Sequence, residues 1–108
     1  MKDKIDLVVE EVSNITKIKQ KKLLSKDRHR ESIDARRLVY TLLRHLFKMP
    51  YVYIANYFNK NHGSVLNAVG MHPHLLKYDE LYNERFHLLY DKLSEKYEKE
   101  IVTELNKK

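Results

Sequence analysis

Turn-forming residues are scarce in this sequence, and their scarcity limits the possible folds more than any other feature. The 108 residues include only two Gly and two Pro, whereas a chain of many short strands needs such residues at its turns. The sequence has no Cys, which excludes disulfides, thiolate zinc sites, iron–sulfur clusters and a cysteine nucleophile. We therefore predict an all-α protein, and its length suits a compact helical domain with its own core.

Apolar residues recur at helical spacing in the first half of the chain. They predict a helix over about residues 4–16 and a shorter helical piece over residues 19–24. Residues 25–31 lack this period and are predicted to form an exposed basic loop. Ser32 is the predicted N-cap of a long helix that ends at Met49-Pro50. The core face of that helix is predicted to consist of Ile33, Leu38, Val39, Leu42, Leu43, Leu46 and Phe47.

The segment after Pro50 contains conflicting signals. Residues 51–58 are rich in the strand formers Tyr, Val, Ile and Phe, but a single strand without a partner would leave its backbone unpaired. We therefore predict a short helix, a turn over residues 59–61 and a further helix that starts near His62. Pro73 is expected to bend or end that helix.

Charge is segregated along the chain, which has a net charge of +6. Residues 17–48 carry eleven Lys and Arg against three acids, a net charge of +8, and residues 49–78 add two Lys and no acid. Residues 1–16 and 79–108 each have a net charge of −2. A polyanion-binding face separates charge in this way, so the pattern favours a nucleic acid over an acidic protein or a membrane surface.

Residues 51–69 have the layout of a helix-turn-helix. A small residue, Ala55, stands where two helices would cross, and Val65 and Ala68 would hold the second helix against the first. In such a unit the start of the second helix lies in the major groove of DNA. The candidate groove-facing residues are Lys60, Asn61, His62, Gly63, Ser64 and Asn67. An ordinary helical hairpin fits the same pattern.

The candidate residues carry groups that suit base edges. Asn61 or Asn67 can present an acceptor and a donor together to adenine. His62 can donate to guanine N7 or pack on a thymine methyl, and Ser64 is short enough to reach a base or a phosphate. The free N–H groups at the helix start also suit phosphate oxygens.

Residues from Ile5 to about Leu76 resemble the C-terminal DNA-binding domain of the bacterial chromosomal replication initiators, the DnaA family. The segments that carry this resemblance are Lys17-Ile18-Lys19 with Lys22–Lys26, the arginines that follow, and the run Asn59-Lys60-Asn61-His62-Gly63-Ser64-Val65-Leu66-Asn67-Ala68. That run is similar to the family signature Gly-Arg-Asp-His-Thr-Thr-Val-Leu-His-Ala. The resemblance implies an all-helical, Trp-repressor-like domain over residues 1–78, followed by a helical segment over residues 79–108.

The resemblance also implies roles for individual residues. Arg28 matches the family arginine that enters the minor groove, where a guanidinium is favoured by the negative potential of A·T-rich DNA. Arg30, Arg36 and Arg44 match positions that face the duplex and bind phosphate. His62 matches the base-reading histidine. These matches imply binding to double-stranded DNA, with a preference for initiator-type boxes, in replication control or transcription regulation.

Five positions of the reading surface depart from the family signature. Lys60 replaces an Arg and loses bidentate geometry, and Asn61 replaces an Asp, so that an amide donor is added. Gly63 and Ser64 replace two Thr, and Asn67 replaces a His. We expect the same mode of docking with an altered or relaxed sequence preference.

A last helix is predicted from Asp79 toward Leu105, with Tyr82, Phe86, Leu89, Leu93, Tyr97 and Ile101 on its apolar stripe. At 1.5 Å per residue it would reach roughly 40 Å, which is longer than a small domain needs. It either packs on its own domain or contacts a second copy of the chain or another protein. An alternative function is therefore a helical interaction module that binds the replication initiator or another acidic partner without DNA.

The residue pattern favours binding over catalysis. No nucleophile stands at a recognisable spacing from a His, and no glycine-rich phosphate loop is present, so we expect neither enzyme activity nor a cofactor. His72 and His74 flank a Pro without an acid at ligand spacing, so no metal site is predicted. The first residues are acidic where a secretory signal needs apolar ones, and no run approaches about 18 apolar residues. The expected location is the cytoplasm, at the nucleoid, with no membrane partner.

Overall fold

Helices account for most of the described chain. The computed structural model describes the backbone of residues 2–106 and the side chains of residues 3–97. Within these limits there is no strand, and the helices in chain order are α1 (Lys2–Thr16), α2 (Gln20–Leu23), α3 (Arg30–Phe47), α4 (Tyr51–Tyr57), α5 (His62–Gly70), α6 (His72–Tyr78) and α7 (Glu80–Asn106). The all-α prediction is confirmed.

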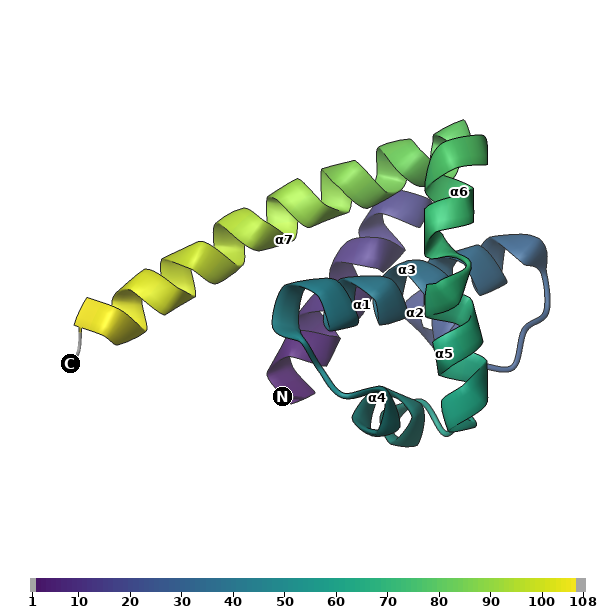
Figure 1. Ribbon diagram of the computed structural model, residues 1–108, viewed down its shortest axis with the longest axis horizontal. Coiled ribbons are helices and arrows are strands. Elements are labelled where there is room, and N and C mark those ends of the chain that lie inside the picture. The colour runs from purple at the N-terminus through teal and green to yellow at the C-terminus, as the bar shows by residue number, and fades with distance from the viewer. Residues whose placement is uncertain (1, 107–108) are drawn as a thin grey trace.

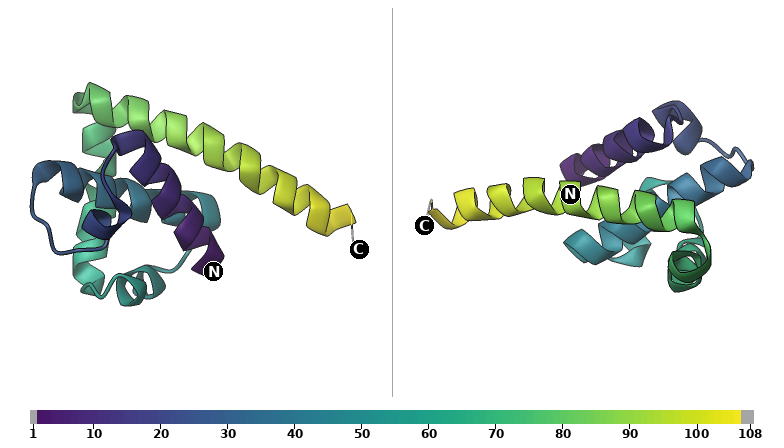
Figure 2. Two further views of the ribbon diagram at one scale, coloured as in Figure 1. Left: turned by 180° about the vertical axis from the view of Figure 1, so that it is seen from behind. Right: turned by 90° about the horizontal axis from the view of Figure 1, so that it is seen from above.

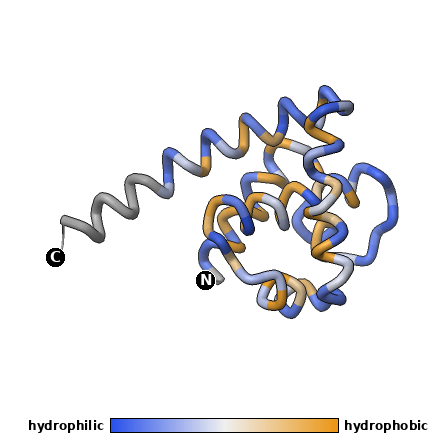
Figure 3. The backbone as a smooth tube through the Cα atoms, in the orientation of Figure 1, coloured by the Kyte–Doolittle hydropathy of each residue, from blue (hydrophilic) through white to orange (hydrophobic). Residues whose placement is uncertain are grey.

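The long helix α3 lies at the centre of the fold and contacts α1, α2, α4, α5 and α7. Figure 1 shows α4 on one side of it and α7 along the other. The apolar stripes predicted for the helices meet around α3, where the fully buried side chains include Val8, Val12, Leu42, Leu43 and Leu89. Figure 3 shows the contrast with the hydrophilic loop over residues 25–29, which lies at the edge of the molecule.

The start of α3 differs from the prediction. The helix begins at Arg30, and His29 stands at its N-cap without a capping hydrogen bond from its side chain. Ser32 lies inside the first turn and is buried, because its hydroxyl donates to the carboxylate of Asp27. Ile33, which was predicted to face the core, is 39% exposed, since it lines the open cavity between α3 and α5.

The segment after Pro50 forms a helix, as predicted. Ile54 and Ala55 of α4 are buried, and α4 ends in a left-handed turn at Asn59, whose φ is 53°. The N–H of Lys60 closes that turn by donating to the carbonyl of Ala55 at 2.8 Å. Pro73 does not simply end a helix but stands in the first turn of α6, where its missing N–H costs no hydrogen bond.

Helix α7 packs against α1, α3 and α6. Asp79 opens it as predicted, because its carboxylate accepts a hydrogen bond from the Tyr82 N–H at 3.0 Å. From the predicted stripe, Tyr82, Phe86, Leu89 and Leu93 are buried and Tyr97 packs edge-on against Phe47. The side chain of Ile101 lies outside the described residues.

The last turns of α7 project past the other helices. Figure 2 shows this projection from behind and from above, and it accounts for the extents of 45 × 29 × 25 Å. Glu11 of α1 fixes the middle of α7, since its carboxylate binds Lys96 at 2.7 Å and Lys92 at 2.9 Å. No described helix combines the length and the apolar character needed to cross a bilayer.

Candidate nucleic-acid interface

Helices α4 and α5 form the predicted helix-turn-helix. Ile54 and Ala55 of α4 pack with Val65 of α5, and all three are at most 2% exposed. Burial of this side of α5 turns its opposite side to solvent. His62, Ser64 and Asn67 are exposed there, so the start of the helix is accessible to a ligand.

Asn61 caps α5. Its side-chain oxygen accepts a hydrogen bond from the Gly63 N–H at 2.7 Å. A Cβ added at Gly63 would stand 3.2 Å from that oxygen, so the small residue gives the cap room. The cap uses one of the two lone pairs on the oxygen that Asn61 was predicted to offer to adenine together with its amide donor. Reading of adenine by Asn61 or Asn67 stays a prediction.

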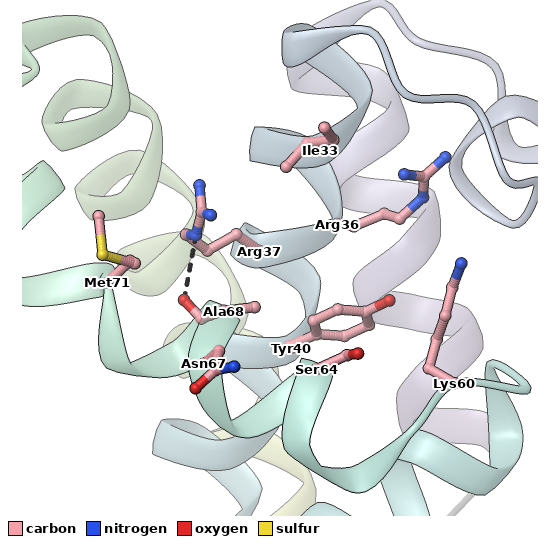
Figure 4. Close-up of a pocket in the computed structure, with 9 residues that line it drawn as sticks. All are labelled: Ile33, Arg36, Arg37, Tyr40, Lys60, Ser64, Asn67, Ala68 and Met71. Atoms are coloured by element: carbon pink, nitrogen blue, oxygen red, sulfur yellow. Dashed lines mark hydrogen bonds between the residues drawn. The ribbon is translucent and has the colours of Figure 1, made fainter.

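One side of α5 borders an open cavity of about 410 Å³ between α5 and α3. Figure 4 shows Lys60, Ser64 and Asn67 at its edge, with Arg36 and Arg37 on the facing side of α3. Arg37 holds the two helices together. Its Nε donates to the Ala68 carbonyl at 3.0 Å, and its Nη1 binds Asp34 at 2.8 Å.

Lys60 links this cavity with the loop between α2 and α3. Burial lowers the pKa of Lys60, and the charges of Arg36, Lys26 and Arg28 lower it further. The positive charges of the loop and of the turn before α5 therefore act on one another. The loop and α5 lie at the end of the body away from the projecting end of α7 (Figures 1 and 2).

Arg28 and Arg30 are exposed at this end of the molecule. The Arg30 side chain is 80% exposed and forms a loose ion pair with Asp34 at 3.7 Å. Neither arginine is buried, so both guanidinium groups are accessible to an anion.

Arg36 departs from its predicted role as a phosphate ligand that faces the duplex. It is only 8% exposed, and its guanidinium donates to the carbonyls of Leu23 at 2.9 Å and Lys22 at 3.3 Å. These carbonyls belong to the last residues of α2, after which no further helical turn follows to supply N–H donors. The arginine therefore joins α2 to α3, and its buried charge adds to the positive potential of the cavity between α3 and α5.

Arg44 lies on the other side of α5. Its guanidinium stacks 4.5 Å from the centre of the Tyr51 ring and donates to the Met49 carbonyl at 3.3 Å. The Tyr51 ring in turn meets the His62 ring edge-on at 6.3 Å. Arg44, Tyr51 and the nearby Lys48 line a second open cavity, of about 740 Å³. Cationic groups thus flank the start of α5 on both sides.

Sequence reasoning missed Arg37, Tyr51 and Asp27. Arg37 stands seven residues after Arg30 and seven before Arg44, and this spacing puts the three arginines on one stripe of α3. That signal was available. Asp27 gave none, because a lone acid in a basic loop has no periodic partner in the sequence.

Comparisons with known proteins agree with this architecture. Residues 5–71 match the family described as the bacterial dnaA protein helix-turn-helix. The chromosomal replication initiator protein DnaA of Leptospira biflexa, from two strains of serovar Patoc, is 27% identical over 89 residues, covering 82% of this chain and 20% of the relative. A crystal structure titled as a DNA replication initiation factor superposes with a TM-score of 0.76 at 25% identity, covering 87% of this chain and 29% of the other.

The chain thus spans about a fifth of the length of these curated relatives. The family match begins in the first turn of α1, ends just after α5 and includes the whole helix-turn-helix. Because this match covers more than half of the chain, the protein belongs to the bacterial DnaA helix-turn-helix family.

Proposed function

We propose that this protein binds double-stranded DNA, with the start of α5 in the major groove and Arg28 in the adjacent minor groove. The observation that supports this most is that the loop carrying Arg28 and the start of α5 lie at the same end of the molecule (Figure 1), where the charges of Arg28 and Lys26 also lower the pKa of Lys60. Two exposed segments that are more than thirty residues apart in the sequence present positive charge beside one surface. A duplex gripped through neighbouring grooves needs that arrangement.

The residues divide between positioning and reading the duplex. Lys60, Arg30 and Arg44 bind phosphates around α5, and the positive end of the helix dipole at its start adds to this. His62, Ser64 and Asn67 are exposed along the helix and meet base edges in the major groove. The proposed activity is binding alone, without a cofactor or a chemical step.

The proposed target is an initiator-type box, and the proposed context is replication control or transcription regulation at the nucleoid. Gly63 and Ser64 offer fewer methyl and hydroxyl groups than the two threonines of the family signature. Each lost base contact removes about 1–3 kcal/mol of discrimination. We therefore expect a smaller gap between box and non-box DNA than a full signature would give.

Fluorescence anisotropy with a box-containing duplex and a scrambled duplex tests this function. Arg28→Ala and His62→Ala are expected to weaken box binding by at least tenfold each, because each removes a groove contact. Lys77→Ala is the matched control, since Lys77 lies at the α6–α7 corner beside Glu80 and Glu84. Equal affinity of the wild type for both duplexes would remove the claim of sequence preference.

A protein partner for α7 is the second candidate, favoured by the projection of its last turns past the body (Figure 2). This function predicts that Arg28→Ala and His62→Ala leave binding of the protein partner unchanged and that charge reversals on α7 abolish it. Sedimentation equilibrium measures whether the partner is a second copy of the chain. A mass that stays monomeric at high protein concentration would exclude self-association.

A further inference from the structure

The loop that carries Arg28 is organised by the acid that precedes it. One Asp27 oxygen accepts a hydrogen bond from the buried Ser32 hydroxyl, and the other lies 2.6 Å from Nδ1 of His29. The ammonium of Lys22 lies 3.9 Å from the same carboxylate. The Asp27 side chain is only 16% exposed, although the ring of His29 beside it is 77% exposed.

The backbone of this loop is tied down as well. The N–H of Asp27 donates to the Ser25 hydroxyl at 3.2 Å, and that hydroxyl donates to the Lys22 carbonyl at 2.7 Å. Asp27 therefore connects the end of α2, through Lys22 and Ser25, with the first turn of α3, through Ser32. Arg28 stands between Asp27 and His29, which are both held by this network.

The charge of Asp27 opposes DNA binding. It stands in the most basic part of the chain, where residues 17–48 carry a net charge of +8, and a carboxylate repels phosphates. Hydrogen bonds from Ser32 and His29 lower the pKa of Asp27 to about 2, so the group stays ionised at neutral pH. An acid at this place weakens general attraction to a duplex, so any benefit to binding must come from the order it imposes.

We propose that Asp27 is a positioning residue for DNA recognition. By fixing the backbone on both sides of Arg28, it aims the arginine at the minor groove and sets sequence preference at the expense of overall affinity. The inference rests on the proposed function, since it assigns a role within the same DNA interface.

The experiment measures affinity for a box-containing and a scrambled duplex in three variants. Asp27→Ala removes both the charge and the hydrogen bonds, Asp27→Asn removes the charge but keeps an acceptor, and Ser32→Ala removes one hydrogen bond without a change of charge. Glu31→Gln is the matched control, because Glu31 is an exposed acid in the first turn of α3. Amide order parameters of residues 25–30 are measured on the same samples without DNA.

Asp27→Ala is expected to bind the scrambled duplex as well as or better than the wild type, while the ratio of box to scrambled affinity falls about tenfold. Ser32→Ala should also lower the ratio of box to scrambled affinity, whereas Asp27→Asn should keep most of the wild-type ratio. Glu31→Gln should raise both affinities together and leave the ratio unchanged. The order parameters of residues 25–30 should fall in Asp27→Ala and hold in Asp27→Asn.

Two results overturn the inference alone. One is an unchanged affinity ratio in Asp27→Ala, which would make Asp27 an electrostatic contributor like Glu31. The other is a loop that stays as ordered in Asp27→Ala as in the wild type. A wild-type ratio of one is a different failure, because it contradicts the proposed sequence preference itself and the inference with it.

Discussion

At the scale of single residues, Asn61 combines two tasks that mutation can separate. Its oxygen caps α5 through the Gly63 N–H, and it stands at the start of the helix proposed to enter the major groove. Asn61→Ala is expected to lower the free energy of unfolding by about 1 kcal/mol, the usual cost of losing a side-chain cap. Asn61→Asp keeps the cap, and its carboxylate is stabilised by the positive end of the helix dipole. The stability of this variant should therefore match that of the wild type. Urea unfolding of the three proteins measures this difference.

DNA affinity distinguishes the two tasks of Asn61. If the residue serves only as a cap, Asn61→Asp should bind DNA with little more loss than its added negative charge explains. A stable Asn61→Asp that loses the box preference would instead show that the amide donor reads a base. Equal stability of Asn61→Ala and the wild type would contradict the capping role.

Another single residue, His72, makes stability depend on pH. It is 5% exposed, its Nδ1 lies 2.8 Å from the Tyr82 hydroxyl, and its ring packs on Phe86. Burial, together with smaller effects of the charges of His45 and His87, lowers the pKa of His72 to about 4. The unfolded chain, with an ordinary pKa of about 6.5, therefore takes up a proton more readily than the folded chain. Stability is complete above that pH and declines as the pH falls toward 4.

The loss attributable to His72 should amount to about 2 kcal/mol over this pH range. His72→Gln keeps a polar group toward Tyr82 without an ionisable ring, so its stability should fall less steeply between pH 7 and pH 4.5. Chemical unfolding at several pH values gives both slopes. Parallel curves for the two proteins would show that His72 does not carry this pH dependence.

At the scale of helices, periodicity predicted what depends on local spacing and missed what depends on tertiary contacts. The stripes of α1, α3 and α7 were readable because buried residues recur every three or four positions. The helical structure of α4 followed from the absence of a partner strand, against its own strand propensity. Ser32 was misread as a cap, because its real partner is the carboxylate of Asp27 in the preceding loop. Arg36 was expected to bind phosphate, and its burial against the end of α2 was missed because nothing in the sequence indicates that α2 ends against it.

The contact between α1 and α7 allows an asymmetric test. Burial raises the pKa of Glu11, but hydrogen bonds from Lys96 and Lys92 outweigh that effect and lower it. The carboxylate is 6% exposed, whereas the two lysine side chains are nearly half exposed. Glu11→Leu leaves Lys92 and Lys96 free to turn to solvent, so it should lower the free energy of unfolding by at most about 1 kcal/mol. Replacing both lysines by Met leaves the buried Glu11 carboxylate unpaired and should lower the free energy of unfolding by about 3 kcal/mol at neutral pH.

Thermal and urea unfolding measure both costs. The double lysine variant should recover stability as the pH falls, because protonation neutralises its unpaired Glu11. Similar losses in the two variants, or no recovery at low pH, would contradict the assignment of the penalty to the buried carboxylate.

At the scale of the whole molecule, the fold turns a segregation in sequence into a segregation in space. The acids of α1 and α7 are partly neutralised where these helices meet, as in the pairs of Glu11 with Lys92 and Lys96. Within the basic middle of the chain, the loop between α2 and α3 and the helix α5 lie together at the end of the body away from the projecting turns of α7 (Figure 1). An approaching duplex would therefore be oriented by charge before any base is read.

This arrangement predicts the salt dependence of DNA binding. Four cations surround the start of α5 with side chains that are not buried, namely Arg28, Arg30, Arg44 and Lys60. With the helix N-terminus they should neutralise about four or five phosphates, so log K should fall with log salt at a slope of about −4. Lys60→Ala should reduce that slope by about one in every duplex sequence, whereas Lys77→Ala should leave it unchanged. A slope near zero would show that phosphates contribute little to binding, and an equal effect of the two lysine variants would show that the positive charge acts diffusely rather than through this surface.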